Sequence, residues 1–267
     1  MGFENKRVII TGAAGGIGEA LARAFHEAGA RLVLGDLDMV RLQPLASELG
    51  AIALQTDVST EAGILKLVAQ TRESYGGVDI FCSNAGILRG HHLELLKGGP
   101  FTPDKDWDQS WKVNVMAHVW AARAVLPEMV ERGDGALIHI ASAAGLLTEM
   151  GSQSYSVTKH AAVGFSEWLA LHYAPAGIRV VCVCPQGVRT PMVTEFVEGH
   201  EHLSQNLLEP EDVARSTLQG LENNQFLVLP HPEVARYFQN KARGYETWLA
   251  GMRKLKQKLW GNNLSDK

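Results

Sequence analysis

The chain has 267 residues, of which 46% are hydrophobic and 20% charged. These fractions are close to those of soluble globular proteins, which excludes extensive disorder, and the length is ordinary for one α/β domain. Lysine and arginine number 25 against 29 aspartates and glutamates, a net charge of -4, which disfavours a nucleic-acid-binding protein because that function needs clustered positive charge.

Membrane spans, export signals and disulfides are not expected. No apolar run approaches the roughly 20 residues that cross a bilayer, and the N-terminus leads into an apolar strand pattern without a secretory signal. The three cysteines, Cys82, Cys182 and Cys184, lie in apolar runs, which favours buried, reduced thiols. We therefore expect a cytoplasmic protein without a membrane partner.

Strand-like apolar runs alternate with helical patterns along the chain. Strands are expected at 8–10, 31–35, 52–55, 80–83, 136–141, 179–184 and 226–229, and helices at 17–28, 39–49, 59–75, 106–131, 154–173 and 210–221. Ser59 is the expected N-cap of the third helix. Continuous apolar strands separated by helices predict a parallel sheet covered on both faces, a doubly wound α/β arrangement of the Rossmann type.

The pattern continues past the last expected strand. A single helical pattern covers about 233–259 and carries an apolar stripe. We interpret the chain as one domain, 1–267, with a core at 5–230 and a C-terminal helical extension at 231–260. The extension either packs on the core or on a partner subunit, or covers the substrate pocket.

A glycine-rich turn follows the first strand. Residues Thr11 to Gly18 read TGAAGGIG and precede a helix, an order typical of a phosphate cradle at a helix N-terminus. A plain turn is the alternative, because the glycine spacing differs from the usual GxGxxG. The expected dinucleotide contacts in this loop are Gly12, Gly16, Ile17 and Gly18.

An acidic residue follows the second strand. Asp36 comes 24 residues after Gly12, about where a carboxylate meets the adenosine ribose of a dinucleotide. A carboxylate there repels a 2′-phosphate, and no arginine or lysine lies in the glycine loop or directly after Asp36. This predicts NAD as the cofactor, although Asp36 is also a candidate helix N-cap.

Three polar side chains form a second motif. Ser142 follows the strand at 136–141, and Tyr155 and Lys159 come later at helical i, i+4 spacing, which places them on one helix face. A nearby ammonium favours the phenolate form of a tyrosine. The set suits proton transfer at a carbinol oxygen while hydride moves to a nicotinamide.

With these motifs the chain resembles the short-chain dehydrogenase/reductase family over about residues 5–230. The matching segments are Thr11 to Gly18, Asp57-Val58, Asn84-Ala85-Gly86, Asn114 and the Ser142, Tyr155, Lys159 set. One departure lies after the sixth strand, where PQGVRT has Gln186 in place of the family's glycine. Gln186 either adds a hydrogen bond to substrate or only requires Gly187 to absorb the turn.

The resemblance implies a role for each matching residue. Tyr155 is the general acid/base, Lys159 lowers its pKa and holds the nicotinamide ribose, and Ser142 positions the substrate oxygen. Asn114 would hold a relay water. Further cofactor contacts are implied for Asp57, Val58, Asn84, Gly86, Pro185, Val188 and Thr190.

The leading hypothesis is NAD-dependent, reversible oxidation of a secondary alcohol to a ketone. Apolar residues in the irregular segments 87–105 and 186–209 and after Ser142 favour a lipophilic or ring-containing substrate: Leu88, Leu93, Leu146, Leu147, Met150, Met192 and Phe196. An NADPH-dependent carbonyl reductase and a non-catalytic NAD-binding regulator are the alternatives. Histidines at 91–92 and at 200 and 202 lack a supporting ligand cluster, so no metal site is predicted.

Assembly is expected only by resemblance. Family members form dimers and tetramers through the two long helices, here expected at 106–131 and 154–173. This implies a homodimer or homotetramer whose interface the C-terminal extension can alter.

Overall fold

The computed structural model describes residues 2–89, 102–193 and 207–260. A seven-stranded sheet in the order β3-β2-β1-β4-β5-β6-β7 runs through it, and every paired strand is parallel. The strands are β1 (Arg7–Thr11), β2 (Arg31–Asp36), β3 (Ile52–Gln55), β4 (Ile80–Ser83), β5 (Gly135–Ile140), β6 (Ile178–Val183) and β7 (Leu227–Val228). The strand order reverses between β1 and β4, where doubly wound sheets bind ligands.

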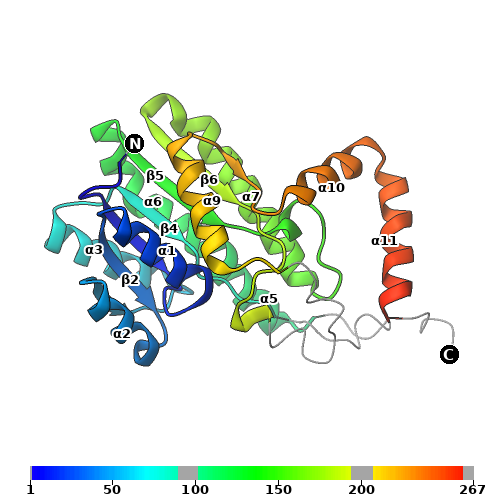
Figure 1. Cartoon of the computed structure of the whole chain (residues 1–267), viewed down its shortest axis with the longest axis horizontal. Coiled ribbons are helices and arrows are strands. Elements are labelled where there is room, and N and C mark those ends of the chain that lie inside the picture. The colour runs from blue at the N-terminus through cyan, green and yellow to red at the C-terminus, as the bar shows by residue number, and fades with distance from the viewer. Residues whose placement is uncertain (1, 90–101, 194–206, 261–267) are drawn as a thin grey trace.

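Helices cover both faces of this sheet (Figure 1). On one face lie α1 (Gly16–Glu27), α2 (Met39–Glu48) and α9 (Pro210–Glu222). On the other lie α3 (Glu61–Tyr75), α6 (Ala117–Arg132) and α7 (Gln153–Tyr173). The expected doubly wound fold is therefore confirmed.

Alternation along the strands divides the core into two layers. In β1, Val8 and Ile10 face α1 and α9, whereas Ile9 faces α3 and α6. All three are fully buried, which explains why the strand is apolar at every position. Each large apolar side chain buried in this way stabilises the fold by about 2 kcal/mol.

Three elements differ from the sequence predictions by more than one residue at a boundary. The helix expected at 106–131 begins at Asp104 and runs as α5 (Asp104–Trp111), a π-helical turn (Lys112–Met116) and then α6. Thr60, not Ser59, caps α3, because its hydroxyl accepts the Gly63 N–H at 3.2 Å. The pattern at 233–259 is two helices, α10 (Pro232–Arg243) and α11 (Tyr245–Trp260), since the chain breaks at Gly244.

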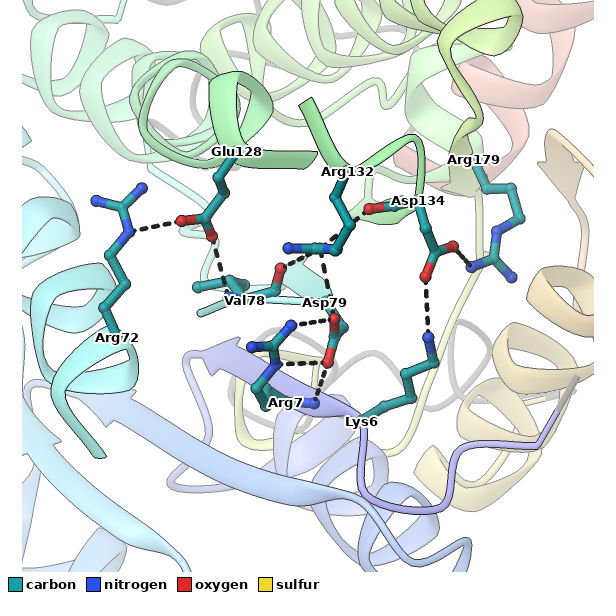
Figure 2. Close-up of polar contacts among 9 residues, drawn as sticks. All are labelled: Lys6, Arg7, Arg72, Val78, Asp79, Glu128, Arg132, Asp134 and Arg179. Atoms are coloured by element: carbon teal, nitrogen blue, oxygen red, sulfur yellow. Dashed lines mark hydrogen bonds and ion pairs between the residues drawn. The ribbon is translucent and has the colours of Figure 1, made fainter. Parts of the chain in front are cut away.

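An ionic network joins the strands at the end of the sheet where they begin (Figure 2). The Asp79 carboxylate, directly before β4, accepts three hydrogen bonds from Arg7 of β1, at 2.6 to 2.9 Å. Asp134, before β5, pairs with Lys6 at 2.9 Å and Arg179 at 3.2 Å. The network fixes the starts of four neighbouring strands, and the opposite end of the sheet carries the glycine turn and Ser142.

The C-terminal extension reaches away from the layers, with α11 standing apart from the sheet (Figure 1). It is attached through α10, whose Val234 is fully buried. Lys241 is also buried, and its Nζ donates hydrogen bonds to the carbonyl oxygens of Leu146 and Leu147, each at 2.8 Å. The expected packing of the extension on the core is thus seen for α10.

Two remaining expectations concern cysteines and membranes. Cys82, Cys182 and Cys184 are free and buried, as predicted, and the Sγ atoms of Cys182 and Cys184 lie 3.9 Å apart on one face of β6 and its end. Within the described ranges, no helix is both long and apolar enough to cross a membrane.

Candidate active site

The glycine turn between β1 and α1 has the backbone that a phosphate cradle needs. Gly12 and Gly16 adopt positive φ angles of 65° and 55°, a region that favours glycine. A Cβ at Gly18 would overlap the Gly12 carbonyl oxygen. The first turn of α1 therefore presents free N–H groups to the cleft, with a dipole that favours an anion.

Asn84 ties this turn to the end of β4. Its Nδ2 donates to the carbonyl oxygens of Thr11 and Gly12 at 2.9 and 3.0 Å. The Thr11 hydroxyl in return accepts the Asn84 N–H at 3.1 Å. Asn84 thus holds the glycine turn in place through its own side chain.

Asp36 lies at the end of β2, beside the turn. Its Oδ2 accepts the Ala14 N–H at 2.9 Å and its Oδ1 accepts the Asp38 N–H at 3.0 Å. The N-cap of α2 is Asp38, so the alternative interpretation of Asp36 as the cap is wrong. The carboxylate instead faces the cleft and keeps lone pairs for further donors.

A cation lies in the same place, contrary to expectation. Arg41, five residues after Asp36, lines the cleft. Its guanidinium lies against Gly15, where a Cβ would come within 2.6 Å of Nη2. Arg41 lies outside the glycine loop and beyond the two residues after Asp36, but the first turn of α2 brings its side chain back over the glycine turn.

Ser142, Tyr155 and Lys159 meet at the other end of the cleft. Ser142 follows β5 and caps a short 3₁₀ turn, where its Oγ accepts the Ala144 N–H at 3.1 Å. Ser152 caps α7 by accepting the Tyr155 N–H at 3.1 Å. One turn after Tyr155 in α7, the buried Lys159 Nζ donates to the Ile140 carbonyl oxygen at 3.0 Å.

Burial controls the protonation of this pair. Desolvation raises the pKa of Tyr155 to about 12, against the lowering effect of its hydrogen bond with Ser142. Desolvation also lowers the pKa of Lys159 to about 8. The net pKa of Tyr155 therefore lies above its ordinary value, because loss of water around the phenol outweighs its hydrogen bond with Ser142.

Asn114 is buried in the π-helical turn before α6. Its Oδ1 accepts the Ile87 N–H at 2.9 Å, and its Nδ2 donates to the Ile87 carbonyl oxygen at 3.0 Å and the Thr158 hydroxyl at 3.1 Å. The side chain therefore joins the segment after β4 to α7. A π-helical turn within an α-helix often marks a functional site.

Gly86 lies between Asn114 and Lys159. A Cβ on Gly86 would come within 3.4 Å of Lys159 Nζ and 3.5 Å of Asn114 Oδ1. The glycine therefore lets the segment after β4 pass close to both side chains. It also lines the cleft, as do Asn84 and Ala85.

The segment after β6 forms the remaining wall, with Pro185, Gln186, Val188 and Thr190 in the lining. The Gln186 side chain is exposed to the cleft. Gly187 does not take a positive φ, and a Cβ there would lie 2.5 Å from Leu207 Cδ2. The glycine thus serves close packing, so the interpretation that it absorbs the turn is wrong.

The cleft has a volume of about 370 Å³ and brings together most of the predicted site residues. The lining includes Gly12, Gly16, Ile17, Asp36, Asn84, Gly86, Ser142, Tyr155, Lys159, Pro185, Val188 and Thr190. Among the described residues, Gly18, Asp57, Val58 and Asn114 do not line it. The exposed Asp57 carboxylate accepts the Ser59 N–H at 2.9 Å.

The predicted apolar pocket is described only in part. Met192 lines the cleft, and Leu146 is buried beneath Lys241. Leu93, Phe196 and the histidines at 91, 92, 200 and 202 lie outside the described residues. Within the described part of the chain, no group of three or more His, Cys, Asp or Glu side chains is placed to hold a metal ion.

Comparisons with known proteins agree with this geometry. The short chain dehydrogenase family model matches residues 6–201. The oxidoreductase UcpA of Salmonella typhimurium is 38% identical over 195 residues, which cover 70% of this chain and 71% of that protein.

Two solved structures share the fold. A short-chain dehydrogenase/reductase from Burkholderia phymatum in complex with NAD has a TM-score of 0.83 and 26% identity, over 92% of this chain and 96% of that one. A short-chain dehydrogenase from Sphingobium yanoikuyae in complex with NADPH has a TM-score of 0.76 and 28% identity, over 92% and 95%.

The parallel sheet, the glycine turn at its switch point and the cleft between them define a dinucleotide-binding oxidoreductase. The chain belongs to the short-chain dehydrogenase family, a family of NAD(P)-dependent oxidoreductases. A dinucleotide fits the residues present. The glycine turn leaves no room for side chains where its main chain must approach a pyrophosphate. Asp36 and Arg41 line the part of the cleft where the adenosine ribose would lie.

Proposed function

We propose that the protein oxidises a secondary alcohol to a ketone, reversibly, with NAD as the cofactor. One observation carries the proposal: Ser142, Tyr155 and Lys159 line the same cleft as the glycine turn and Asp36. A hydroxyl seated at Tyr155 would therefore lie within the space that a dinucleotide extending from Asp36 can reach. A bound nicotinamide supplies the acceptor for the hydride that leaves the carbinol carbon.

Residues of the chain itself carry out the proton transfer. Ser142 donates a hydrogen bond to the substrate oxygen and orients it toward Tyr155. The Tyr155 phenolate takes the hydroxyl proton as the ketone forms, and the phenol returns it in the reverse reaction. The Lys159 ammonium favours the phenolate by its charge, and Asn114 holds the segment at Ile87 against α7, beside Lys159.

NAD is favoured over NADP by the position of Asp36. Its carboxylate already accepts two main-chain hydrogen bonds, which fixes it toward the cleft with lone pairs left for the two ribose hydroxyls. A 2′-phosphate in the same place would meet like charge.

The substrate proposal follows from the lining near Tyr155. Ile140, Ala141, Pro185, Pro191, Met192 and Val193 contribute apolar surface to the cleft. Gln186 adds an uncharged amide to this lining. We expect a lipophilic or ring-containing alcohol with one hydrogen-bonding group near the reacting carbon.

The test is a panel of cyclic and linear secondary alcohols, with NAD and NADP in parallel and reduced nicotinamide followed by its absorbance. The proposal predicts turnover of apolar alcohols and a kcat/KM that is higher with NAD. Turnover of no alcohol and no ketone across the panel, by protein that binds NADH, would contradict it and favour the non-catalytic alternative.

A second candidate function has one observation in its favour. The Arg41 guanidinium over Gly15 is suited to a phosphate, because guanidinium groups bind phosphate oxygens in a bidentate way. This favours an NADPH-dependent carbonyl reductase. A kcat/KM for ketone reduction that is higher with NADPH than with NADH would establish this alternative.

We also propose a homo-oligomer formed through α5, α6 and α7. These helices carry large apolar side chains that are exposed in the single chain: Trp111, Val130, Val157, Trp168 and Leu171. Leu171 is 78% exposed, and an interface would cover such a patch. Light scattering of the purified protein should give a dimeric or tetrameric mass, and a monomeric mass at micromolar concentration would contradict the proposal.

A further inference from the structure

His231 is a buried histidine at the start of the C-terminal extension, directly before α10. It is 3% exposed, and both of its ring nitrogens contact the main chain of the loop after β6. Its Nδ1 accepts the Gln186 N–H at 3.1 Å, and its Nε2 lies 3.1 Å from the Gly187 carbonyl oxygen. One side chain thus bonds two neighbouring residues of this loop, which lie 45 and 44 positions earlier in the sequence.

These contacts determine the protonation state of the ring. An N–H donor at Nδ1 requires a lone pair there, and a carbonyl oxygen at Nε2 requires a proton there. Only the neutral Nε2–H tautomer satisfies both. The ring is therefore a fixed acceptor–donor pair that matches the N–H of one residue and the C=O of the next.

The loop it holds is the cleft wall between Pro185 and Thr190. Other main-chain hydrogen bonds of the wall include Ala143 N–H to the Pro185 oxygen at 2.8 Å, Leu208 N–H to the Gly187 oxygen at 3.1 Å and Arg189 N–H to the Leu208 oxygen at 2.9 Å. None of these pairs the Gln186 N–H. Without the His231 ring, the Gln186 N–H would lose this hydrogen bond, at the position where the family has a glycine.

The same wall reaches the glycine turn. A Cβ on Gly16 would lie 2.9 Å from the Thr190 methyl carbon, so Thr190 sits against the first residue of α1. A shift of the wall at Gln186 would be passed along four residues to this contact. The position of the wall therefore sets the width of the cleft that a dinucleotide enters.

We propose that His231 is a positioning residue for the active site: its neutral Nε2–H ring holds the Pro185–Thr190 wall in the conformation that accepts the dinucleotide and directs the Gln186 side chain at the substrate. His231 does not touch the reacting atoms. The proposal rests on the proposed function in taking this cleft as the dinucleotide site. The hydrogen bond from Gln186 to His231 connects two departures from the family, Gln186 itself and the C-terminal extension.

The test compares three variants by NADH fluorescence titration and by steady-state kinetics, well below their melting temperatures. His231→Phe keeps the ring and removes both nitrogens. His231→Asn retains an acceptor near the place of Nδ1. Val234→Ala is the matched control, because it weakens the packing of the buried start of α10 without touching the wall.

The proposal predicts that His231→Phe raises the Kd for NADH and lowers kcat/KM, each by about tenfold or more, because the Gln186 N–H loses its acceptor and the Gly187 carbonyl oxygen keeps only the Leu208 N–H. His231→Asn should recover part of both losses, and Val234→Ala should change the melting temperature more than either value. Wild-type affinity in His231→Phe, or an equal loss in Val234→Ala, would overturn the proposal.

A second measurement does not depend on activity. In protein labelled with ¹⁵N-histidine, the wild type should show one ring with the Nε2–H tautomer that His231→Phe removes. The Nδ1–H tautomer at His231 would contradict the geometry. If the wild type bound neither NADH nor NADPH, the proposed function would fail, and the tautomer would still decide whether His231 holds the wall.

Discussion

The Lys159 ammonium lies 5.5 Å from the centre of the Tyr155 ring, one helical turn along α7. Burial shifts the pKa values of these two groups in opposite directions. Burial lowers the pKa of Lys159 to about 8 and raises the pKa of Tyr155 to about 12. Near neutral pH the lysine is therefore charged while the phenol keeps its proton, and alcohol oxidation needs the phenolate.

The pH dependence of Lys159→Met follows from this relationship. Alcohol oxidation should rise with pH, because the raised pKa of Tyr155 keeps the phenol protonated until alkaline pH. The Lys159 ammonium is charged at neutral pH and is lost as pH rises past about 8, so Lys159→Met removes a charge that favours the phenolate at neutral pH and should change the rate little at alkaline pH. At neutral pH, kcat/KM should fall about 10- to 100-fold, as a charge a few ångströms away predicts.

The control is Lys66→Met, which removes an exposed lysine on α3. Its pH profile should match the wild type. If Lys159→Met kept the wild-type profile, the ammonium would have no influence on the titrating phenol.

The second prediction concerns cofactor preference, and it distinguishes the effect of Asp36 from that of Arg41. Asp36→Asn keeps the size of the side chain and removes its charge, so the ratio of kcat/KM for NAD to that for NADP should fall about tenfold. Arg41→Gln should shift the same ratio toward NAD, because the guanidinium over Gly15 lines the cleft beside the glycine turn. A ratio that neither variant changes would refute the assignment of the ribose to this corner.

The third prediction concerns the ionic network of Figure 2. Burial raises the pKa of Asp79, but the hydrogen bonds and charge of Arg7 outweigh it, and the net pKa lies below the ordinary value. A carboxyl group of this kind stabilises the fold above its unfolded pKa of about 3.9, and the contribution is lost as pH falls through the lower folded value.

Asp79→Asn should therefore lower the free energy of unfolding at neutral pH by about 2 kcal/mol, since it weakens a charged and bidentate contact. The difference from the wild type should shrink as pH falls below about 4. Asp108→Asn, an exposed change on α5, is the control. Denaturant unfolding at several pH values measures both, and a pH-independent difference would argue against the charge as its cause.

The fourth prediction concerns the contribution of Lys241 to stability. Its ammonium donates to the carbonyl oxygens of Leu146 and Leu147 and lies 4.9 Å from the Trp248 ring centre and 5.5 Å from that of Tyr245. Lys241→Met keeps the apolar stem and leaves both carbonyls without this donor. Stability should fall by about 1 to 3 kcal/mol.

Hydrogen exchange localises the effect of Lys241→Met. Amides of the segment after Ser142 and of α11 should exchange faster, whereas those of β1 to β5 should not change. Lys254→Met, which alters an exposed lysine of α11, should leave exchange near Ser142 as in the wild type. Unchanged exchange there in Lys241→Met would show that the extension does not hold this segment.

The sheet and the catalytic set were predictable because their signals are local. Strands buried on both faces are apolar at every position, and the spacing of Tyr155 and Lys159 places them on one helix face wherever the helix packs. Ser59 and Thr60 are neighbouring hydroxyl residues, and either type can cap a helix. Only the way α3 packs in the fold selects Thr60, so the sequence alone places the N-cap one residue too early.

The missed features depend on distant contacts or on burial. Arg41 reaches the glycine turn only because α2 folds back beside β2. His231 meets Gln186 through the packing of α10 on the end of β6, a contact that no local pattern indicates. The raised pKa of Tyr155 arises from desolvation, and the sequence shows the lysine nearby but not the loss of water around the phenol.

The most direct test of the central claim is Tyr155→Phe, assayed with the best alcohol of the panel alongside an NADH titration. The ring and its packing remain, and only the phenol oxygen is lost. We predict an NADH affinity within about twofold of the wild type and a turnover reduced at least about 100-fold, the scale of general acid/base catalysis. Turnover close to that of the wild type would contradict the account, because the proton would then be transferred by another group.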